Sequence, residues 1–259
     1  MQTEIIIVDN ASLDDTVSII QNSYPHVKLI CNLSNVGFSI ATNQGIRAST
    51  NEFILWLNPD TILRPDSLAR LAQFLANTPA AGIAGPKVLN EDGTFQPQCK
   101  RGKQTPLTAL MHLTGLGRLM PQLPGASEYL LGHLSPDLPH QVTAVSGCCL
   151  LARRAMAEQI GLLDEAIFGF GEDVDWCVRA AKAGWQVWYR PESVITHLKG
   201  QGGAHSQPYR KAWALHQAMW IFYRKHLQAS YSPIISVLFW LGLRVSLGLS
   251  YSRIWLKRR

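Results

Sequence analysis

Short apolar runs alternate with helical segments through the first 90 residues, and this alternation limits the possible fold more than any other feature. The strand-like runs, rich in Ile, Val and Leu, are residues 4–8, 27–31, 53–57 and 83–88. The intervening stretches, about 14–23, 40–48 and 65–76, have the apolar spacing of helices. Such alternation predicts an α/β fold with a mostly parallel sheet and helices on both faces. Ligands of such folds bind beyond the carboxyl ends of the strands.

The alternation stops near residue 96. From there to about residue 139 the sequence is rich in Gly, Pro, Leu and basic residues, which predicts a mobile loop with a short helix beside a site. Regular structure is expected again as a strand within 142–151, a helix near 154–160 and a last strand over 186–189.

Two of the expected strands end in polar side chains. Asp9 and Asn10 follow the first run, and Asn58-Pro59-Asp60 follows the third. Asp60 lies on a turn that Pro59 stiffens, and there its carboxylate can hold a divalent cation. A strand-end Asp is also a common helix cap, so capping is the alternative interpretation.

Three carboxylates, Glu172, Asp173 and Asp175, fall within four positions where a helix is expected to begin. The helix dipole favours acidic residues there, so capping is again one interpretation. Two preceding glycines and the following Trp176 exceed what capping requires. With a helix that begins near Glu172, Asp173 and Trp176 share a face, where the carboxylate can lie against a ring and a bound hydroxyl. We therefore predict that Asp173 is a general base.

His197 follows the last expected strand and precedes a glycine-rich stretch. A single histidine is more often structural than a ligand. Together with Asp60, however, His197 can supply two ligands to a divalent cation whose other positions are filled by phosphate oxygens and water. The sequence therefore predicts Asp60 and His197 as a pair of metal ligands.

Six segments, taken in order, carry a resemblance to a known family. They are Ile6–Ser12, Asn35–Phe38, Leu57–Thr61, Ser146–Cys148, Phe168–Cys177 and His197. Together they resemble family 2 glycosyltransferases of the GT-A fold, and within them the bacterial rhamnosyltransferases of surface polysaccharide assembly. The ordered set is far more specific than any one segment, and the resemblance extends from residue 4 to about residue 205.

The resemblance implies an inverting transfer of a sugar from a nucleotide-diphosphate donor to a glycan or lipid-linked acceptor. The subgroup implies rhamnose, with dTDP-rhamnose or a UDP-sugar as the donor. The residues that match the family's nucleotide-sugar contacts are Asp9, Asn10, Asn35, Gly37 and Asn58. Asp173 matches the residue that deprotonates the acceptor hydroxyl, and Asp60 and His197 match the positions that bind Mn²⁺ or Mg²⁺ on the diphosphate.

Two features depart from the family pattern. Many members have Asp at the position of Asn58, although Asn-Pro-Asp is frequent in the rhamnosyltransferase-like subgroup. Members also have a strand and a nucleotide-binding turn before the position of Glu4, so the expected sheet lacks its first strand. The alternative function is therefore a catalytically silent relative that acts as a membrane-bound interaction or scaffold module. The combination of Glu172, Asp173, Asp175 and His197 argues against it, because a silent chain has no need to keep it.

The positive charge of the chain lies in its last part. Residues 1–192 contain 14 basic and 18 acidic side chains, and ten Lys and Arg without any Asp or Glu follow. Because residues 231–249 are also strongly apolar, the expected partner is an anionic membrane surface and not nucleic acid. Arg244 near the centre would cost about 2.5–3.5 kcal/mol in a spanning helix, so we favour an interfacial segment. A spanning helix and a helix buried against the rest of the protein are the alternatives.

These features together predict a GT-A glycosyltransferase domain over residues 1–205 and a basic, apolar helical extension over 206–259. The five cysteines are odd in number and have no CxxC spacing, and the N-terminus has no signal-peptide pattern, which favours a reducing compartment. The predicted location is cytoplasmic and peripheral, on the inner face of the cell membrane.

Overall fold

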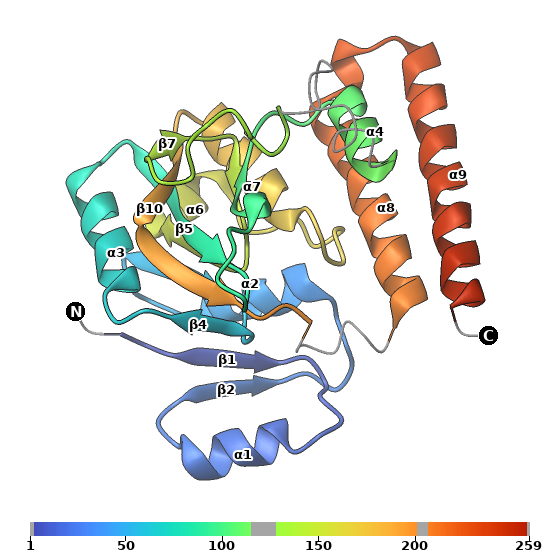
Figure 1. The fold of residues 1–259 in the computed structure, drawn as a ribbon. Helices are drawn as coiled ribbons and strands as arrows, with labels where there is room; N and C mark the ends of the chain where they lie inside the picture. Colours follow the sequence, from blue (N-terminus) through green and yellow to red (C-terminus); the bar gives the residue numbers. More distant parts are fainter. Residues whose placement is uncertain (1–2, 115–127, 201–206, 258–259) are drawn as a thin grey trace.

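The computed structural model describes residues 3–114, 128–200 and 207–257. Its central element is a six-stranded sheet with the order β3-β9-β5-β10-β4, to which β7 is added through β10 (Figure 1). The strands are β3 (Phe53–Leu57), β4 (Thr61–Leu63), β5 (Ala81–Leu89), β7 (His140–Gln141), β9 (Cys149–Arg153) and β10 (Gln186–His197). β5 and β10 are parallel, whereas β9 is antiparallel to β3 and β5, and both β4 and β7 are antiparallel to β10.

The α/β class expected from the sequence is confirmed, but the strand directions are a correction, because this sheet is mixed and not mostly parallel. Parallel neighbouring strands need a crossover connection, and β4 and β9 are reached without one. β4 follows β3 after the tight turn at Asn58–Asp60, and β9 returns from the long segment after β5. β10 also extends well beyond the expected 186–189, because a register shift between Arg190 and Val194 interrupts its periodicity.

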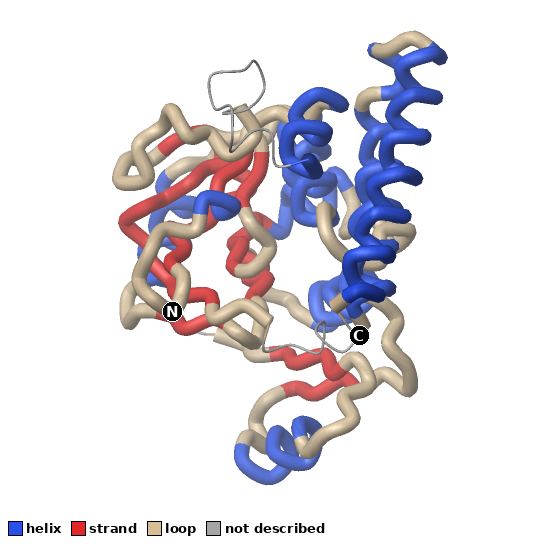
Figure 2. The backbone as a smooth tube through the Cα atoms, turned by 45° about the vertical axis from the view of Figure 1, so that its right-hand side comes forward, coloured by secondary structure: helices blue, strands red, loops and turns tan. Residues whose placement is uncertain are grey.

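β1 (Ile6–Asp9) and β2 (Lys28–Cys31) form a separate parallel pair, connected by α1 (Thr16–Ser23) and followed by α2 (Phe38–Ala48). Within the described residues, this pair is not hydrogen-bonded to the six-stranded sheet. Figures 1 and 2 show the pair and α1 at one end of the molecule.

The main core lies between the sheet and three helices, α3 (Ser67–Asn77), α6 (Arg154–Ile160) and α7 (Glu172–Lys182). α3 packs on β5 and β10, α6 packs on β9, and α7 packs on β5 and β10. Leu71, Leu75, Ile83 and Leu150 are each fully buried here. Burial of a side chain of this size contributes about 1.5–3 kcal/mol.

The segment after residue 96, expected to be a loop with a short helix, contains more regular structure than predicted. It includes the 3₁₀ turn η1 (Pro97–Cys99), β6 (Lys100–Arg101) and α4 (Pro106–Thr114). β6 pairs antiparallel with β8 (Ala144–Val145), just before β9. Residues 115–127 of the expected loop lie outside the described part of the chain.

The chain ends in a helical hairpin, residues 207–257, in which α8 (Pro208–His226) and α9 (Pro233–Leu256) lie side by side, with η3 (Gln228–Ser230) between them (Figures 1 and 2). α9 has 24 residues, about 36 Å of helix, and within the described residues it is the one helix long and apolar enough to cross a membrane. Only 6% of its most apolar window is buried. The alternative of a helix buried against the rest of the protein is therefore wrong.

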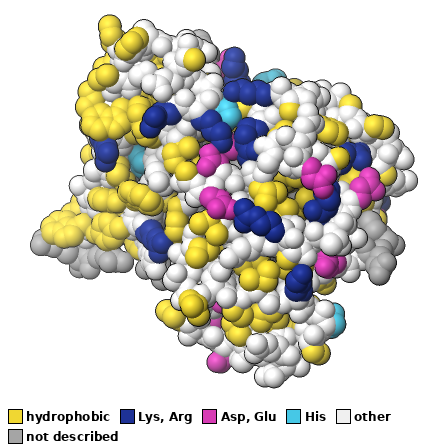
Figure 3. Space-filling view, turned by 180° about the vertical axis from the view of Figure 1, so that it is seen from behind, with side chains coloured by type: hydrophobic (Ala, Val, Ile, Leu, Met, Phe, Trp, Pro, Cys, Tyr) yellow, Lys and Arg dark blue, Asp and Glu magenta, His cyan; other side chains and the backbone are white. Residues whose placement is uncertain are grey.

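α9 keeps few of its side chains inside the protein. Ser236 hydrogen-bonds Tyr223 Oη of α8 at 2.8 Å, and Ser246 hydrogen-bonds His216 Nε2 of α8 at 3.0 Å. Leu243 is buried, and the Phe239 ring packs on the Tyr223 ring. Six other large apolar side chains are each more than half exposed: Ile234, Val237, Leu238, Val245, Leu249 and Leu256. In Figure 3 hydrophobic side chains gather over this part of the surface, with basic side chains among them.

A buried ion cluster fixes the hairpin to α7. Asp175 is fully buried and bonds Arg179 Nε at 2.8 Å, Lys225 Nζ at 3.0 Å and His226 Nε2 at 2.7 Å. Burial alone would raise the pKa of Asp175, but His226, Arg179 and Lys225 outweigh it and lower this pKa to about 2. Asp175 therefore holds α8 against α7 and is not available as a base.

Candidate active site

The predicted metal turn and His197 meet at one edge of the main sheet. β3 and β10 run in the same direction as β5, so the carboxyl ends of all three meet at this edge. The turn Asn58–Asp60 leaves β3 here and His197 ends β10 here. β4 starts from the same edge and pairs with β10 so that Thr61 lies opposite His197. This is the edge at which α/β folds bind ligands.

The structure brings Asp60 and His197 into contact. His197 Nε2 lies 3.1 Å from Asp60 Oδ1, and its Nδ1 lies 3.3 Å from Gln96 Oε1. An imidazole held by one oxygen on each side has a fixed ring orientation, as in metal sites where the second nitrogen is hydrogen-bonded. A depression of about 480 Å³ adjoins the pair and is lined by Asn90, Glu91, Asp92, His197, Leu198 and Lys199.

The donor atoms at this turn suit a hard divalent cation. Asn58 Oδ1 is buried without a hydrogen-bond partner in the described structure, close in sequence to Asp60. A carboxylate, an amide oxygen and an imidazole fit Mn²⁺, and the oxygens fit Mg²⁺. Burial raises the pKa of the neighbouring Cys148 to about 11. Within the described residues no cluster of three or more His, Cys, Asp or Glu forms.

Asp173 lies in the first turn of α7, which begins after two residues with positive φ, Phe170 at 69° and Gly171 at 90°. Its Oδ2 accepts hydrogen bonds from Gly147 N at 2.8 Å and from Arg101 Nη2 at 2.5 Å. Its Oδ1 accepts a bond from Val174 N at 2.7 Å. The carboxylate is mostly buried, with 10% of its side chain exposed.

Glu172 and Trp176 differ from Asp173 in their surroundings. Burial and the adjacent Asp173 charge raise the pKa of Glu172 to about 8, so this carboxyl group is mostly protonated at neutral pH. Its Oε2 is buried and has no hydrogen-bond partner in the described structure. Trp176 is fully buried in the core and donates from Nε1 to Gly161 O at 2.9 Å. The prediction that its ring lies beside a bound hydroxyl is therefore wrong.

Gly147 and Cys148 connect the predicted base to the predicted metal turn. The amide of Gly147 donates to Asp173, and the carbonyl of Cys148 accepts from Asn58 N at 2.9 Å. A side chain at position 147 would meet the Trp56 ring at 2.6 Å, so the close approach requires glycine. Two consecutive residues thus hold both halves of the site at the same sheet edge.

The predicted nucleotide-binding residues form a second group at the end of β1. Asn10 is its centre: Oδ1 accepts from Val36 N at 3.0 Å, and Nδ2 donates to Asn35 Oδ1 at 3.1 Å and to Gly37 O at 3.2 Å. Asp9 precedes it and is 6% exposed, with Oδ2 accepting from Ser12 N. The structure therefore brings Asp9, Asn10, Asn35 and Gly37 together.

Gly37 joins this group to the segment that leads to the base. Its φ is 94°, and a side chain here would lie 2.8 Å from the ring of Phe168. The amide of Phe38 donates to Phe168 O at 2.7 Å. The turn after β2 is thereby fixed against the loop that precedes Glu172.

Backbone strain is concentrated around these residues. Among the described residues, Ala11, Phe170 and Lys199 are three of the four non-glycine residues with positive φ, at 64°, 69° and 54°. One follows Asn10, one precedes the base and one follows His197. Strained conformations of this kind cost about 1–3 kcal/mol each and are common at functional sites.

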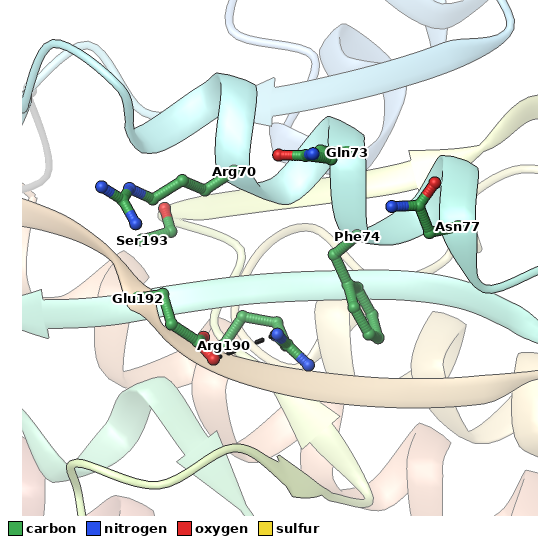
Figure 4. Close-up of a pocket in the computed structure, with 7 residues that line it drawn as sticks. All are labelled: Arg70, Gln73, Phe74, Asn77, Arg190, Glu192 and Ser193. Carbon is green, nitrogen blue, oxygen red and sulfur yellow. Dashed lines mark hydrogen bonds and ion pairs between the residues drawn. The ribbon is translucent and has the colours of Figure 1, made fainter.

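Sequence reasoning missed Arg101 and Gln96, which contact Asp173 and His197 respectively. Both lie where the strand and helix pattern is lost, so no periodicity indicated them. A second cavity, of about 280 Å³, lies between α3 and β10 and is lined by Arg70, Gln73, Phe74, Asn77, Arg190, Glu192 and Ser193 (Figure 4). None of the predicted site residues lines this cavity.

The fold and the site define a class of enzyme, the GT-A glycosyltransferases. A family model described as "Glycosyltransferase like family 2" matches residues 1–219. The N-acetylglucosaminyl-diphospho-decaprenol L-rhamnosyltransferase of Mycobacterium tuberculosis is 31% identical over 232 residues, which cover 84% of this chain and 73% of that protein. The dTDP-rhamnosyl transferase RfbF of Shigella flexneri is 28% identical and covers 76% of this chain and 60% of its own length. The chain therefore belongs to glycosyltransferase family 2 and is an enzyme of that family.

Solved structures support the fold. The mannosyltransferase PcManGT of Pyrobaculum calidifontis, in complex with GDP-Man and Mn²⁺, matches with a TM-score of 0.55 at 17% identity. This match covers 96% of the present chain and 64% of that chain. GalNAc-T7 with UDP, GalNAc and Mn²⁺ matches with a TM-score of 0.55 at 16% identity, over 85% of this chain and 41% of that one. Both of these neighbours were solved with Mn²⁺.

Proposed function

We propose that this protein is an inverting glycosyltransferase that moves rhamnose from dTDP-rhamnose, or a sugar from a UDP-sugar, to a hydroxyl of a cell-surface polysaccharide or lipid-linked glycan precursor. The observation that carries the proposal is the joint attachment of Asp173 and the Asn58 turn to Gly147 and Cys148. Proton removal and leaving-group stabilisation both need to occur close to one sugar, and the shared attachment supports the assignment of the two groups to one site. The rhamnosyltransferase names of two relatives support the choice of sugar.

In the proposed reaction, Asp173 accepts the proton of the acceptor hydroxyl. The hydroxyl oxygen forms the new bond to the anomeric carbon, and the bond from that carbon to the diphosphate oxygen breaks, with its electron pair leaving on the nucleoside diphosphate. A divalent cation, when bound by Asp60 and His197, offsets the charge that grows on the leaving diphosphate. Asp9, Asn10, Asn35, Gly37 and Asn58 bind the nucleotide sugar. Asn10 presents Asn35 and Gly37 to this ligand through the hydrogen bonds described above.

Asp173→Asn tests the assignment of the base. We expect turnover to fall by roughly 10²–10⁴, the contribution of general-base catalysis, while affinity for the nucleoside diphosphate and Mn²⁺ is kept. Turnover within a factor of three of the parent contradicts the assignment. A chain that binds nucleotide but transfers no sugar, with or without Asp173, supports the silent scaffold instead.

His197→Ala tests the metal site in the same preparation. Calorimetry of nucleoside-diphosphate binding should show a loss of about 10–100-fold in the Mn²⁺-dependent part of the affinity. Gln96→Ala, which removes the partner of the other ring nitrogen, should have a smaller effect. If His197→Ala leaves the metal dependence unchanged, His197 is only structural.

We also propose that the hairpin attaches the enzyme to the inner face of the cell membrane, with a catalytic domain over 1–205 and a membrane-associated extension over 206–259. The outward apolar face of α9 supports contact with lipid, and Arg244, Arg253 and Lys257 suit anionic headgroups. α8 carries exposed Arg and Lys, and Asp175 fixes it to α7. A spanning α9 that kept its contacts with α8 would draw those charges into hydrocarbon, so the geometry favours α9 in the plane of the interface.

A further inference from the structure

Arg101 is the one residue in contact with the predicted base that the mechanism so far leaves without a role. It ends β6, is 9% exposed and donates from Nη2 to Val145 O at 2.7 Å and to Asp173 Oδ2. Its Nε is buried without a partner in the described structure. Because an arginine buried to this degree is costly, its retention here needs a reason.

The two oxygens of Asp173 are held differently. Oδ2 accepts from both Arg101 and Gly147, whereas among the described residues Oδ1 accepts only from the amide of Val174. A carboxylate oxygen has two lone-pair sites, so Oδ1 keeps one acceptor position and Oδ2 keeps none. A proton from the acceptor therefore has one available oxygen, Oδ1.

No other positively charged side chain is found among the groups named below that face the Asp173 carboxylate. Glu172 is the second carboxyl group, and its pKa is raised as described above. The thiols of Cys148 and Cys177 also face this group, and burial keeps both protonated, with pKa values of about 11 and about 12. Tyr129 interacts with Arg101. Within the described residues facing the pair, Arg101 is thus the positive charge that balances one ionised carboxylate.

We propose that Arg101 is a positioning residue for the base: its guanidinium holds Oδ2 of Asp173, places a buried positive charge beside the adjoining carboxyl groups of Glu172 and Asp173, and leaves Oδ1 to take the acceptor proton. This inference rests on the proposed role of Asp173 as the base. The guanidinium does not touch the sugar or the diphosphate in this role. It acts on the reaction only through the orientation and the charge environment of Asp173.

Removal of the Arg101 guanidinium should shift the pH profile of kcat in one direction, and a purely structural role does not predict that shift. Without Arg101, two buried carboxyl groups adjoin each other with no positive charge beside them, so a negative charge in this pair becomes more costly. Since the base works only when ionised, the acidic limb of the profile of kcat against pH must move to higher pH. The affinity for nucleotide and metal, which depends on the other half of the site, must stay the same.

The test uses the full chain in detergent, dTDP-rhamnose, Mn²⁺ and a short-chain N-acetylglucosaminyl-diphospho-polyprenol as the acceptor probe. In Arg101→Gln we expect kcat to fall about 100-fold and the acidic limb to move up by about one pH unit or more. Arg101→Lys keeps the charge without the planar fork, so it should lose about tenfold in kcat with the acidic limb near that of the parent. Both variants should bind dTDP and Mn²⁺ within about twofold of the parent. Arg153→Gln is the matched control. Arg153 ends β9 away from the site, is mostly buried and pairs with Glu52, so this variant should keep the pH profile of the parent.

A double-mutant cycle distinguishes failure of the Arg101 role from failure of the Asp173 role. If Arg101→Gln folds poorly, the cycle can use Arg101→Lys in its place. In an Asp173→Asn background, removal of Arg101 should lower kcat by less than about threefold further. A residue that acts only through Asp173 has nothing left to position in this background. Additive losses, or a lower kcat with an unmoved acidic limb, overturn the inference. If Asp173→Asn itself retains the parent turnover, the proposed function fails, and that result is distinct from failure of Arg101 alone.

Discussion

The sheet region, residues 3–200, and the helical hairpin, residues 207–257, differ in how much of their apolar surface the chain itself covers. In the sheet region, Leu71 and Leu75 of α3 are fully buried against β5 and β10. In α9 of the hairpin only Ser236 and Leu243 are buried, while Leu238 and Val245 are 62% and 63% exposed. The sheet region is thus stabilised by removing apolar surface from water within the chain itself. The hairpin keeps its apolar surface for a contact outside the chain, which we propose to be lipid.

The largest effect is expected where the two regions meet. Asp175→Asn leaves Arg179 and Lys225 without their buried carboxylate, and we expect a loss of about 3–5 kcal/mol in the free energy of unfolding at pH 7, measured by urea denaturation in detergent. Because the folded-state pKa is lowered to about 2, this contribution is present above the ordinary Asp pKa of about 3.9 and is lost as the pH falls through 2. The difference between parent and variant should therefore shrink between pH 4 and pH 2.

Asp164→Asn is the matched control for this prediction. Asp164 also contacts Lys225, at 2.7 Å, but its side chain is 25% exposed. We expect it to cost no more than about 1 kcal/mol. A loss below 1 kcal/mol in Asp175→Asn would mean that the hairpin is not anchored through this cluster.

The next effect compares the same substitution in both regions. Leu75→Ala should lower the free energy of unfolding by about 2–5 kcal/mol, because it leaves a cavity in the main core. Leu238→Ala should change it by less than about 0.5 kcal/mol in detergent-free buffer, because that side chain is mostly exposed. Equal losses in the two variants would show that α9 is covered by the protein itself and would remove the contrast between the regions.

The smallest effect per residue is electrostatic. Each Lys or Arg near an anionic surface contributes about 1 kcal/mol, and at physiological salt its reach is about 8 Å. In sedimentation with vesicles, binding to anionic lipid should weaken with salt without vanishing, because the apolar face of α9 adds a salt-insensitive part. Removal of residues 231–259 should abolish binding to the vesicles. Equal binding to neutral and anionic vesicles refutes the electrostatic part, and a protein that only detergent extracts indicates a spanning helix.

Local patterns predicted those parts of the fold that local chemistry determines. The expected strand over 53–57, the helix over 14–23 and the acidic start of α7 correspond to β3, α1 and the first turn of Glu172–Lys182. Strand direction was not predictable in the same way, because apolar runs carry no information on which neighbour they pair with. β9 reads as a buried strand in either direction, and its antiparallel place between β3 and β5 results from the long segment before it.

In the candidate site, too, local patterns were predictable and long-range contacts were not. Asp60 and His197 were predictable because each follows a strand, and strand ends meet at one edge of the sheet. Arg101 was not, because it lies in a segment without periodicity and contacts Asp173 across 72 positions of sequence. The ion cluster around Asp175 could not be predicted from the sequence either. Asp175 lies two positions after Asp173 on one helix, and only the approach of α8 places Lys225 and His226 on it.

The anomeric configuration of the product tests most directly whether one carboxylate and one cation act on opposite sides of the donor's anomeric carbon. The measurement is an NMR spectrum of the product formed by the full chain with Mn²⁺ from dTDP-rhamnose of known configuration and the diphospho-polyprenol acceptor. A single displacement with Asp173 as base predicts a product of inverted configuration from the first turnover onward, formed roughly 10²–10⁴ times more slowly in Asp173→Asn. A product of retained configuration would contradict it, because retention requires a covalent or ion-pair intermediate that this arrangement does not provide.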